Sequence, residues 1–385
     1  MNQKEVREIK KRLNPEKDSI SRIYGCYVNA AGEIVTTLDM SVGLMEQEEA
    51  ELYFKLLKKT LSGTLGKNLL DIAFSIAQVE NSDEHRLLQG LRSSHLRDAG
   101  LRDALYQRII ESLDFGEDSY VILLASDSYD VPFKGSDDEI FEEGSGEVFD
   151  YILCCICPVK DAKSALRYIA DEHNFRGAST GHVLSAPELG FLFPAFDDRA
   201  ANIYNALYYS RRPDELHQEF IDGVFHTEPP MSAGEQKAAF ETALCQGLED
   251  QCSMEVLQAI HERIHDQLQE HKERKDPEPP TLTPADVGMI LADQGVERER
   301  IAAFQERCGE EFGENAVLNP ENLIDPGKFQ VKTEQITVSV DPEFSYRVET
   351  CMIDGKKYIM IPVGKGVEVN GLAVNVSAVQ TEELS

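Results

Sequence analysis

The pattern of hydrophobic and polar residues predicts a sheet in the first half of the chain. Two alternating segments, Arg22–Val28 and Glu33–Leu38, are joined by turn-forming residues and predict a β-hairpin. The continuous apolar segments Tyr120–Ala125 and Val148–Cys157 are typical of strands that are buried on both faces of a sheet. Shorter strands are predicted at Leu69–Phe74, Arg167–His173 and Phe191–Phe193.

Apolar residues at helical spacing predict helices that cover this sheet. These helices are expected at residues 3–13, Glu46–Leu61, Ser82–His95 and Leu101–Leu113. The fold class is therefore α+β, with a mixed or antiparallel sheet covered by helices.

The segment Pro187–Arg212 predicts a buried strand, a tight turn at Pro194 and a helix. Asp197 is placed to be the N-cap of that helix, and Asp198 adds a second carboxylate to its first turn. Arg211 and Arg212 stand at the expected C-terminal end, before Pro213. The apolar stripe of this helix would be formed by Ala200, Ile203, Tyr204 and Leu207.

The second half of the chain is predicted to be helical and then β-rich. Ser232 and Glu235 form a capping-box pattern, and Thr283-Pro284 marks another helix start. Beyond Asn319 the period becomes two, and Asp354-Gly355 and Asn370-Gly371 predict hairpin turns. The expected divisions are an α+β core (1–226), a helical segment (227–275), a Pro-rich linker (276–282), a helical hairpin (283–318) and a small β unit (319–385).

The charge distribution argues against direct nucleic-acid binding. The net charge is −31 over 385 residues, yet residues 1–112 carry 16 basic and 17 acidic side chains. Residues 113–150 hold one basic and 12 acidic side chains, and their acidic segment Gly135–Glu147 is expected to be an exposed loop. Such a chain repels phosphate, so contact with DNA would depend on a few lysines of the N-terminal quarter, namely Lys55, Lys58, Lys59 and Lys67.

The eight cysteines and the absence of targeting segments indicate a cytoplasmic protein. The N-terminal segment is charged, and no apolar run approaches the ~18 residues of a membrane span, so we expect no membrane association. Cys154, Cys155 and Cys157 lie in an apolar strand, where Cys155 and Cys157 share a face and Cys154 faces the opposite way. We interpret them as reduced, buried residues.

Two patterns could carry chemistry. Residues 261–265 match H-E-x-x-H, in which His261 and His265 could grip a zinc ion. Charged neighbours and a missing third ligand favour the interpretation that His261 lies at the edge of a core. Asp197 and Asp198, with His182 and Glu188 upstream, could form a hydrolytic acid–base site, although helix capping already accounts for both aspartates. We expect no cofactor.

Five segments resemble a bacterial family known as a domain of unknown function. They are RIYGCYVNAAGEIV (22–35), LLKKTLSGTLGKNLLDI (56–72), YILCCICPVK (151–160), ELGFLFPAFDDRAANIYNALYY (188–209), and the stretch from FIDGVF (220–225) into MSAGEQ (231–236). This resemblance covers the whole chain and implies no activity. Over residues 113–375 the order of elements is also similar to the bacterial nucleoid-associated protein family, and neither resemblance transfers a catalytic residue.

The sequence thus predicts a cytoplasmic, non-enzymatic protein that binds a macromolecular partner. The expected partner is a protein, with direct nucleic-acid binding weak or absent, and any association with the nucleoid would run through another protein. The alternative is a hydrolase that uses Asp197, Asp198 and His182, or a zinc site at His261 and His265.

Overall fold

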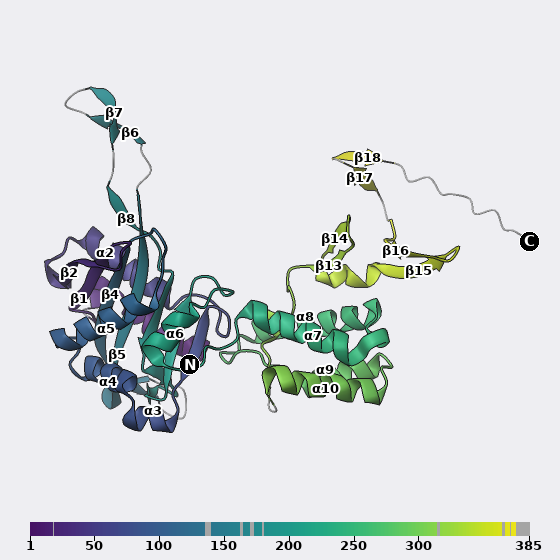
Figure 1. The fold of residues 1–385 in the computed structure, drawn as a ribbon, viewed down its shortest axis with the longest axis horizontal. Helices are drawn as coiled ribbons and strands as arrows, with labels where there is room; N and C mark the ends of the chain where they lie inside the picture. Colours follow the sequence, from purple (N-terminus) through teal and green to yellow (C-terminus); the bar gives the residue numbers. More distant parts are fainter. Residues whose placement is uncertain are drawn as a thin grey trace, which may run out of the picture. The chain divides into compact units, whose positions relative to one another are not determined.

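The structure is a computed structural model that describes residues 1–17, 19–134, 140–161, 165–169, 173–178, 181–313, 316–363, 366–369 and 371–374 (Figure 1). The chain divides into two compact units. Unit 1 comprises Met1–Gln236 and Asp276–Pro279, and unit 2 comprises Lys237–Lys275 and Pro280–Ser385. The five-part division expected from the sequence is finer and stays a prediction.

Unit 1 is built around an eight-stranded sheet. Its strands follow the order β2-β1-β4-β5-β9-β12-β3, and β8 pairs with the end of β5. Each neighbouring pair is antiparallel, which confirms the predicted α+β class. The strands are β1 (Arg22–Val28), β2 (Ile34–Ser41), β3 (Leu69–Ala73), β4 (Tyr120–Lys134), β5 (Ile140–Asp161), β8 (His182–Leu184), β9 (Leu189–Phe193) and β12 (Asn205–Ser210).

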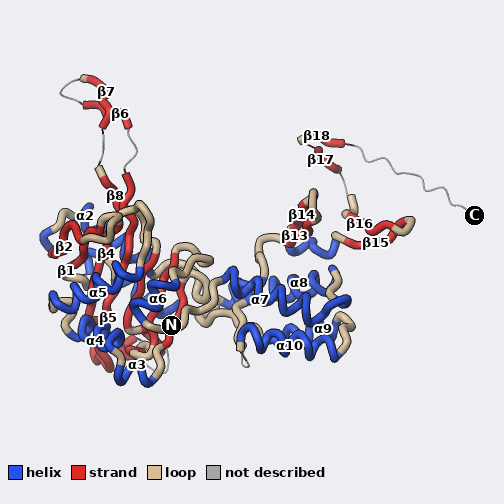
Figure 2. The backbone as a smooth tube through the Cα atoms, in the orientation of Figure 1, coloured by secondary structure: helices blue, strands red, loops and turns tan. Residues whose placement is uncertain are grey.

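Helices cover both faces of this sheet (Figure 2). One core joins the sheet to α1 (Gln3–Arg12) and α2 (Gln47–Thr60). The core on the other face joins it to α4 (Asp83–Ser93), α5 (Ala99–Ser112) and α6 (Gln218–Phe225), and the short α3 (Ile76–Asn81) precedes α4. Cys154 belongs to this second core and Cys155 and Cys157 to the first, so the predicted alternation of the three buried cysteines is confirmed.

The helix predicted from Asp197 to Arg212 is wrong. This segment forms β10 (Ala195–Asp197), β11 (Ala200–Asn202) and β12. Asp198 and Arg199 have φ angles of 49° and 61°, so they are the two central residues of a tight hairpin turn rather than a first helical turn. Pairing of β12 between β3 and β9 buries Leu207, Tyr208 and Tyr209, and this sheet contact outweighs the local helical spacing.

Two other predictions need correction. The acidic segment Gly135–Glu147 is not wholly a loop, because β5 begins at Ile140 and pairs with β4, while residues 135–139 lie outside the described residues. The strand expected at Arg167–His173 is instead β6 (Ala165–Ile169), which pairs with β7 (Asn174–Ala178). Long β4 and β5 arms thus extend beyond the apolar runs that predicted them, because ladder pairing continues into their polar ends.

Unit 2 packs helices around a third core. It contains most of α7 (Ala233–Leu248), with α8 (Met254–Arg274), α9 (Pro284–Asp293), α10 (Arg298–Phe312) and the short α11 (Pro320–Leu323). Ser253 caps α8 and Thr283 forms a capping box with Asp286, and the capping box predicted at Ser232 is present before α7. No helix in the described part of the chain is long and apolar enough to cross a bilayer.

In the part of the chain that the structure describes, three short hairpins follow the helices of unit 2 (Figure 2). Asp354 and Gly355, with φ angles of 49° and 73°, make the predicted turn between β15 and β16, whereas Asn370 lies outside the described residues. The hairpins pair β13 (Phe329–Lys332) with β14 (Thr337–Val340), β15 (Glu349–Ile353) with β16 (Lys356–Met360), and β17 (Val367–Val369) with β18 (Leu372–Val374).

Candidate functional site

Asp197, Asp198 and His182 do not form one constellation. Asp197 accepts a hydrogen bond from Asn202 Nδ2 over 2.6 Å and forms an ion pair with the N-terminal ammonium, and Asp198 is an exposed turn residue. His182 lies on β8, 3.0 Å from Asp161 at the end of β5. The partners of β9 and β8 on β5 run from Ile152 to Asp161, a stretch of roughly 30 Å at 3.3 Å per residue. His182, which pairs with the last residue of β5, is therefore separated by this length from Phe193, which pairs with Ile152 and leads to Asp197.

In the H-E-x-x-H segment of α8, the two histidines are buried and the glutamate is exposed to solvent. His261 and His265 are both 8% exposed, and the His261 Nε2 donates to the Asp325 carbonyl oxygen over 3.1 Å. Glu262, by contrast, is exposed. Among the described residues no other histidine, cysteine or carboxylate completes a group of three metal ligands with these histidines. The expected core-edge position of His261 is thus what the structure shows, and its ring packs edge-on against Phe329.

The opposite face of α8 forms a groove with α9, which we call the α8–α9 groove. It has a volume of about 870 Å³. Five acidic side chains, one arginine and four apolar side chains are among the residues that line it. The lining residues are Ala259, Glu262, Arg263, Asp266, Gln267 and Glu270 of α8, Thr281 and Leu282, and Asp286, Met289, Ile290, Asp293 and Gln294 of α9 and its end.

The lining of the α8–α9 groove follows from helical periodicity. Residues 259, 262, 263, 266, 267 and 270 recur every three or four positions, so they share one face of α8. Asp286 is engaged in the capping box of α9, and Glu270 pairs with Arg274 over 2.9 Å. Glu262, Asp266 and Asp293 are exposed and form no ion pair with any residue that the structure describes. Met289, which is 62% exposed, presents an apolar surface between these charges.

A second groove lies in unit 1, between α2 and β8. It has a volume of about 690 Å³ and is lined mainly by apolar side chains, including Leu52, Leu56, Val183 and Leu184. Two of the lysines that the sequence singled out, Lys55 and Lys59, stand at its rim together with Glu49. Its two lysines and single glutamate make it the less strongly charged of the two grooves.

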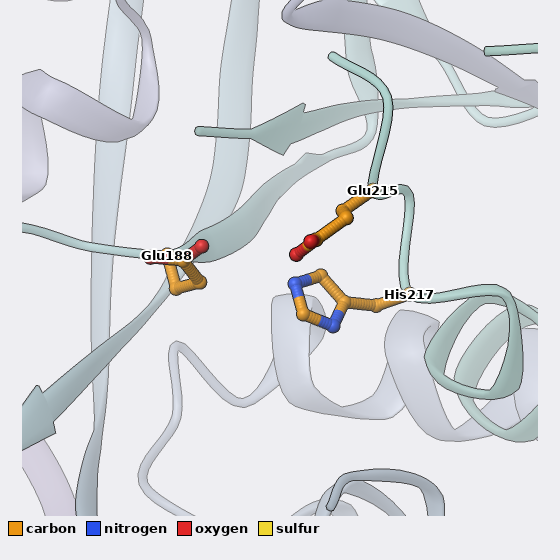
Figure 3. A group of neighbouring side chains, drawn as sticks. All are labelled: Glu188, Glu215 and His217. Carbon is orange, nitrogen blue, oxygen red and sulfur yellow. The ribbon is translucent and has the colours of Figure 1, made fainter. Parts of the chain in front are cut away.

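Glu188, Glu215 and His217 form a compact group in unit 1, which we call the Glu–His cluster (Figure 3). One donor atom from each residue lies within 4.8 Å of the others. Glu188 precedes β9, whereas Glu215 and His217 belong to the loop between β12 and α6. Glu188 is buried and accepts a hydrogen bond from Arg212 Nε over 2.8 Å, with Arg211 3.6 Å away.

The imidazole of His217 has an unusual environment. Its Nε2 atom is buried and has no hydrogen-bond partner, and the ring points toward the two carboxylates (Figure 3). Burial lowers the pKa of His217 below its ordinary value, although the negative charges of Glu188 and Glu215 act in the opposite direction. The neutral imidazole therefore dominates at neutral pH, and neutral imidazole is the form that ligates metals.

Sequence reasoning placed Glu188 beside His182 and missed Glu215 and His217. The cluster arises because Ser210 of β12 pairs with Leu189 of β9, which brings the residues beyond both strand ends together. The only local sequence signal for this cluster is the Glu-x-His spacing at 215–217, shortly after Arg211 and Arg212.

The family of the chain follows from comparison with family models. The family described as Domain of unknown function (DUF4317) matches residues 1–372, so the chain belongs to this family. This confirms the resemblance carried by the five segments above. No curated protein matches the chain, and the resemblance to nucleoid-associated proteins therefore gains no support.

Proposed function

We propose that this protein is a non-enzymatic binding protein of the cytoplasm, and that its α8–α9 groove holds a basic, amphipathic helical segment of a protein partner. The observation that carries this proposal is the composition of the groove, which is lined by five carboxylates and one guanidinium together with the apolar side chains of Ala259, Leu282, Met289 and Ile290. An amphipathic helix that lies in a groove buries its apolar face and places its charged residues at the rim.

Charge complementarity indicates that the partner segment is positively charged. Glu262, Asp266 and Asp293 are exposed and lack ion-pair partners among the described residues, so lysines or arginines of a partner could pair with them. Met289 and Ile290 supply the apolar contact, and methionine adapts readily to different side chains. The same acidity repels phosphate, so association with the nucleoid would have to run through this protein partner.

The cytoplasmic location is supported by the thiols. All eight cysteines are free, and Cys154, Cys155 and Cys157 are fully buried in the sheet. Free cysteines in this number are typical of a reducing compartment.

Peptide binding to the full chain tests the proposal. The probe is a fluorescent synthetic peptide of about five helical turns with lysine on one face and leucine on the other, measured by anisotropy. The matched probe has the same composition in scrambled order, so it carries the same charge without an apolar stripe. We expect the amphipathic peptide to bind at least about tenfold more tightly than the scrambled one, since only the former can bury its leucines in the groove.

Charge-reversal variants locate the binding site. The groove variant changes Glu262, Asp266 and Asp293 to lysine, and the control variant makes the same change at the exposed residues Glu299, Glu306 and Glu311 of α10. We expect a loss of affinity of at least about tenfold in the groove variant and less than about threefold in the control. Equal losses in the two variants, or equal binding of both peptides, would show only the attraction of a chain with net charge −31 for any polycation.

A further inference from the structure

The Glu–His cluster is held in place by the segments on either side of it. Ser210 Oγ lies 2.8 Å from the carbonyl oxygen of Arg212 and 2.7 Å from that of Glu215, which folds the loop back toward β12. The Asn68 side-chain amide donates to the Ser210 carbonyl oxygen over 3.1 Å. His217 adopts a left-handed backbone conformation with φ of 49°, which turns the chain into α6. The side chains of Glu215 and His217 therefore belong to a loop that hydrogen bonds hold against the end of β12.

One guanidinium bridges the two carboxylates of this cluster. Arg212 Nε donates to Glu188 Oε1 over 2.8 Å, and its Nη1 donates to Glu215 Oε1 over 2.8 Å. The side chain of Arg212 is 59% exposed, so it can turn into solvent without disturbing the core. The imidazole of His217 has no share in this ion-pair network, because its Nε2 is buried beside the carboxylates and lacks a hydrogen-bond partner.

We propose that Glu188, Glu215 and His217 form a binding site for a divalent transition-metal ion of the zinc class, which replaces the guanidinium of Arg212. Two carboxylates and one imidazole are oxygen and nitrogen ligands of the kind that Zn²⁺ takes, with a fourth position left for water. Ca²⁺ and Mg²⁺ are disfavoured here, because both ions prefer oxygen ligands and this site presents an imidazole nitrogen. A divalent ion also supplies the positive charge that Arg212 brings to the two glutamates, and gives the buried Nε2 a partner.

Binding of Co²⁺ to the full chain reports on this geometry. Co²⁺ replaces Zn²⁺ in such sites and has visible absorption that is intense for low coordination numbers and changes when a nitrogen ligand is lost. A chelator first removes any metal from the protein, which is then titrated with Co²⁺. Zn²⁺ is added afterwards to displace the bound Co²⁺. We expect one ion per chain and loss of the visible band on addition of Zn²⁺.

Three substitutions separate a metal site from a structural ion pair. Glu215→Gln and His217→Asn should weaken Co²⁺ binding by more than the roughly tenfold to hundredfold typical of residues that only support a ligand. Asparagine tolerates the left-handed backbone of position 217, so this variant should still fold. Arg212→Ala should instead tighten binding, because it removes the competing cation. The control is His226→Asn, which alters an exposed histidine that pairs with Asp222.

The direction of the Arg212→Ala effect is decisive. Tighter Co²⁺ binding in this variant, with loss in the two ligand variants and no change in the control, supports the site. The proposal is overturned if the wild-type chain gives no saturable band, if His217→Asn binds like the wild type, or if Arg212→Ala weakens binding. Circular dichroism of each variant confirms that it is folded.

Discussion

Arg12 and Asp127 form a two-pronged ion pair that joins α1 to β4, in which Nε donates to Oδ2 over 2.6 Å and Nη2 donates to Oδ1 over 2.9 Å. The side chain of Asp127 is only 2% exposed and also accepts a hydrogen bond from the Tyr151 hydroxyl over 3.1 Å. The guanidinium of Arg12 lies over the ring of Tyr129, 4.3 Å from its centroid. This pair therefore anchors the first helix of the chain to the centre of the sheet.

Removal of Arg12 should be strongly destabilising. Arg12→Ala leaves the Asp127 carboxylate buried without its cation, and we expect the free energy of unfolding to fall by about 3 kcal/mol. The matched control is Arg22→Ala, because Arg22 also donates two hydrogen bonds to one aspartate, Asp39, but this pair is half exposed, and its loss should cost less than about 1 kcal/mol. Urea denaturation compares the two variants, and equal losses would contradict the assigned role.

The turn at Asp198 makes a different prediction. Because Asp198 has φ of 49°, Asp198→Gly should leave stability unchanged or raise it slightly, whereas Asp198→Val should lower it by about 1–2 kcal/mol. Thermal denaturation of both variants provides the measurement. A helical first turn would reverse the order, since glycine is the poorer helix former.

The buried His261 of α8 predicts a pH dependence of the free energy of unfolding. Burial lowers the pKa of His261 below 6.5, while its hydrogen bond to Asp325 acts to raise it. Below the unfolded pKa of about 6.5 the unfolded chain therefore binds more protons than the folded chain, and stability falls as the pH falls.

His261→Gln should remove part of this loss, because glutamine can donate to the same carbonyl oxygen without titrating. Denaturation at about pH 7.5 and about pH 5.5 should show a smaller decrease in the variant, by at most about 1.4 kcal/mol, because pH 5.5 lies only about one unit below the unfolded pKa. His226→Gln, which changes an exposed histidine, should leave the decrease as it is in the wild type. An unchanged pH dependence in His261→Gln would contradict the prediction.

Gly247 marks a close contact between α7 and α10. A Cβ atom at this position would lie 2.5 Å from the Cα of Phe304, so Gly247→Ala should overpack the core of unit 2 and cost about 1–3 kcal/mol. Gly309→Ala is the control, because a Cβ there meets nothing within 4 Å, and alanine should stabilise α10 by up to about 1 kcal/mol. Opposite signs in denaturation of the two variants are the expected result.

Duplex DNA should not form a stable complex with the isolated protein near physiological ionic strength. Lys55, Lys58, Lys59 and Lys67 could together support a slope of log affinity against log salt no steeper than roughly −3.6. Anisotropy titration at two salt concentrations measures this slope. Tight, salt-resistant binding that survives replacement of Lys55, Lys58 and Lys59 by glutamate would refute the charge argument.

Local signals predicted those elements whose ends are determined locally. Ser232 and Thr283 cap helices in the structure because their hydroxyl oxygens accept hydrogen bonds from backbone N–H groups three residues later, a spacing that the sequence displays directly. The burial of Cys154 and Cys155 on opposite faces of β5 follows from strand alternation alone.

Distant pairing could not be predicted in the same way. Asp197 lies before apolar residues at helical spacing, but β12 inserts between β3 and β9, and no local pattern reveals those partners. The Glu–His cluster depends on the same register, since Glu188 reaches Glu215 and His217 only through the pairing of β9 with β12. Sequence reasoning therefore identified one of its three residues and paired it with the wrong histidine.

The placement of β3 has a consequence for synthesis of the chain. β3 follows the β1–β2 hairpin in the sequence but pairs with β12 at the other edge of the sheet. Ala73 can therefore pair only after Asn205 has been synthesised, about 130 residues later, which is on the order of ten seconds of translation. During this time Leu69 and Ile72, both buried in the finished sheet, have no strand partner. A nascent chain paused before residue 205 should consequently bind chaperones through this segment and release them once β12 emerges from the ribosome.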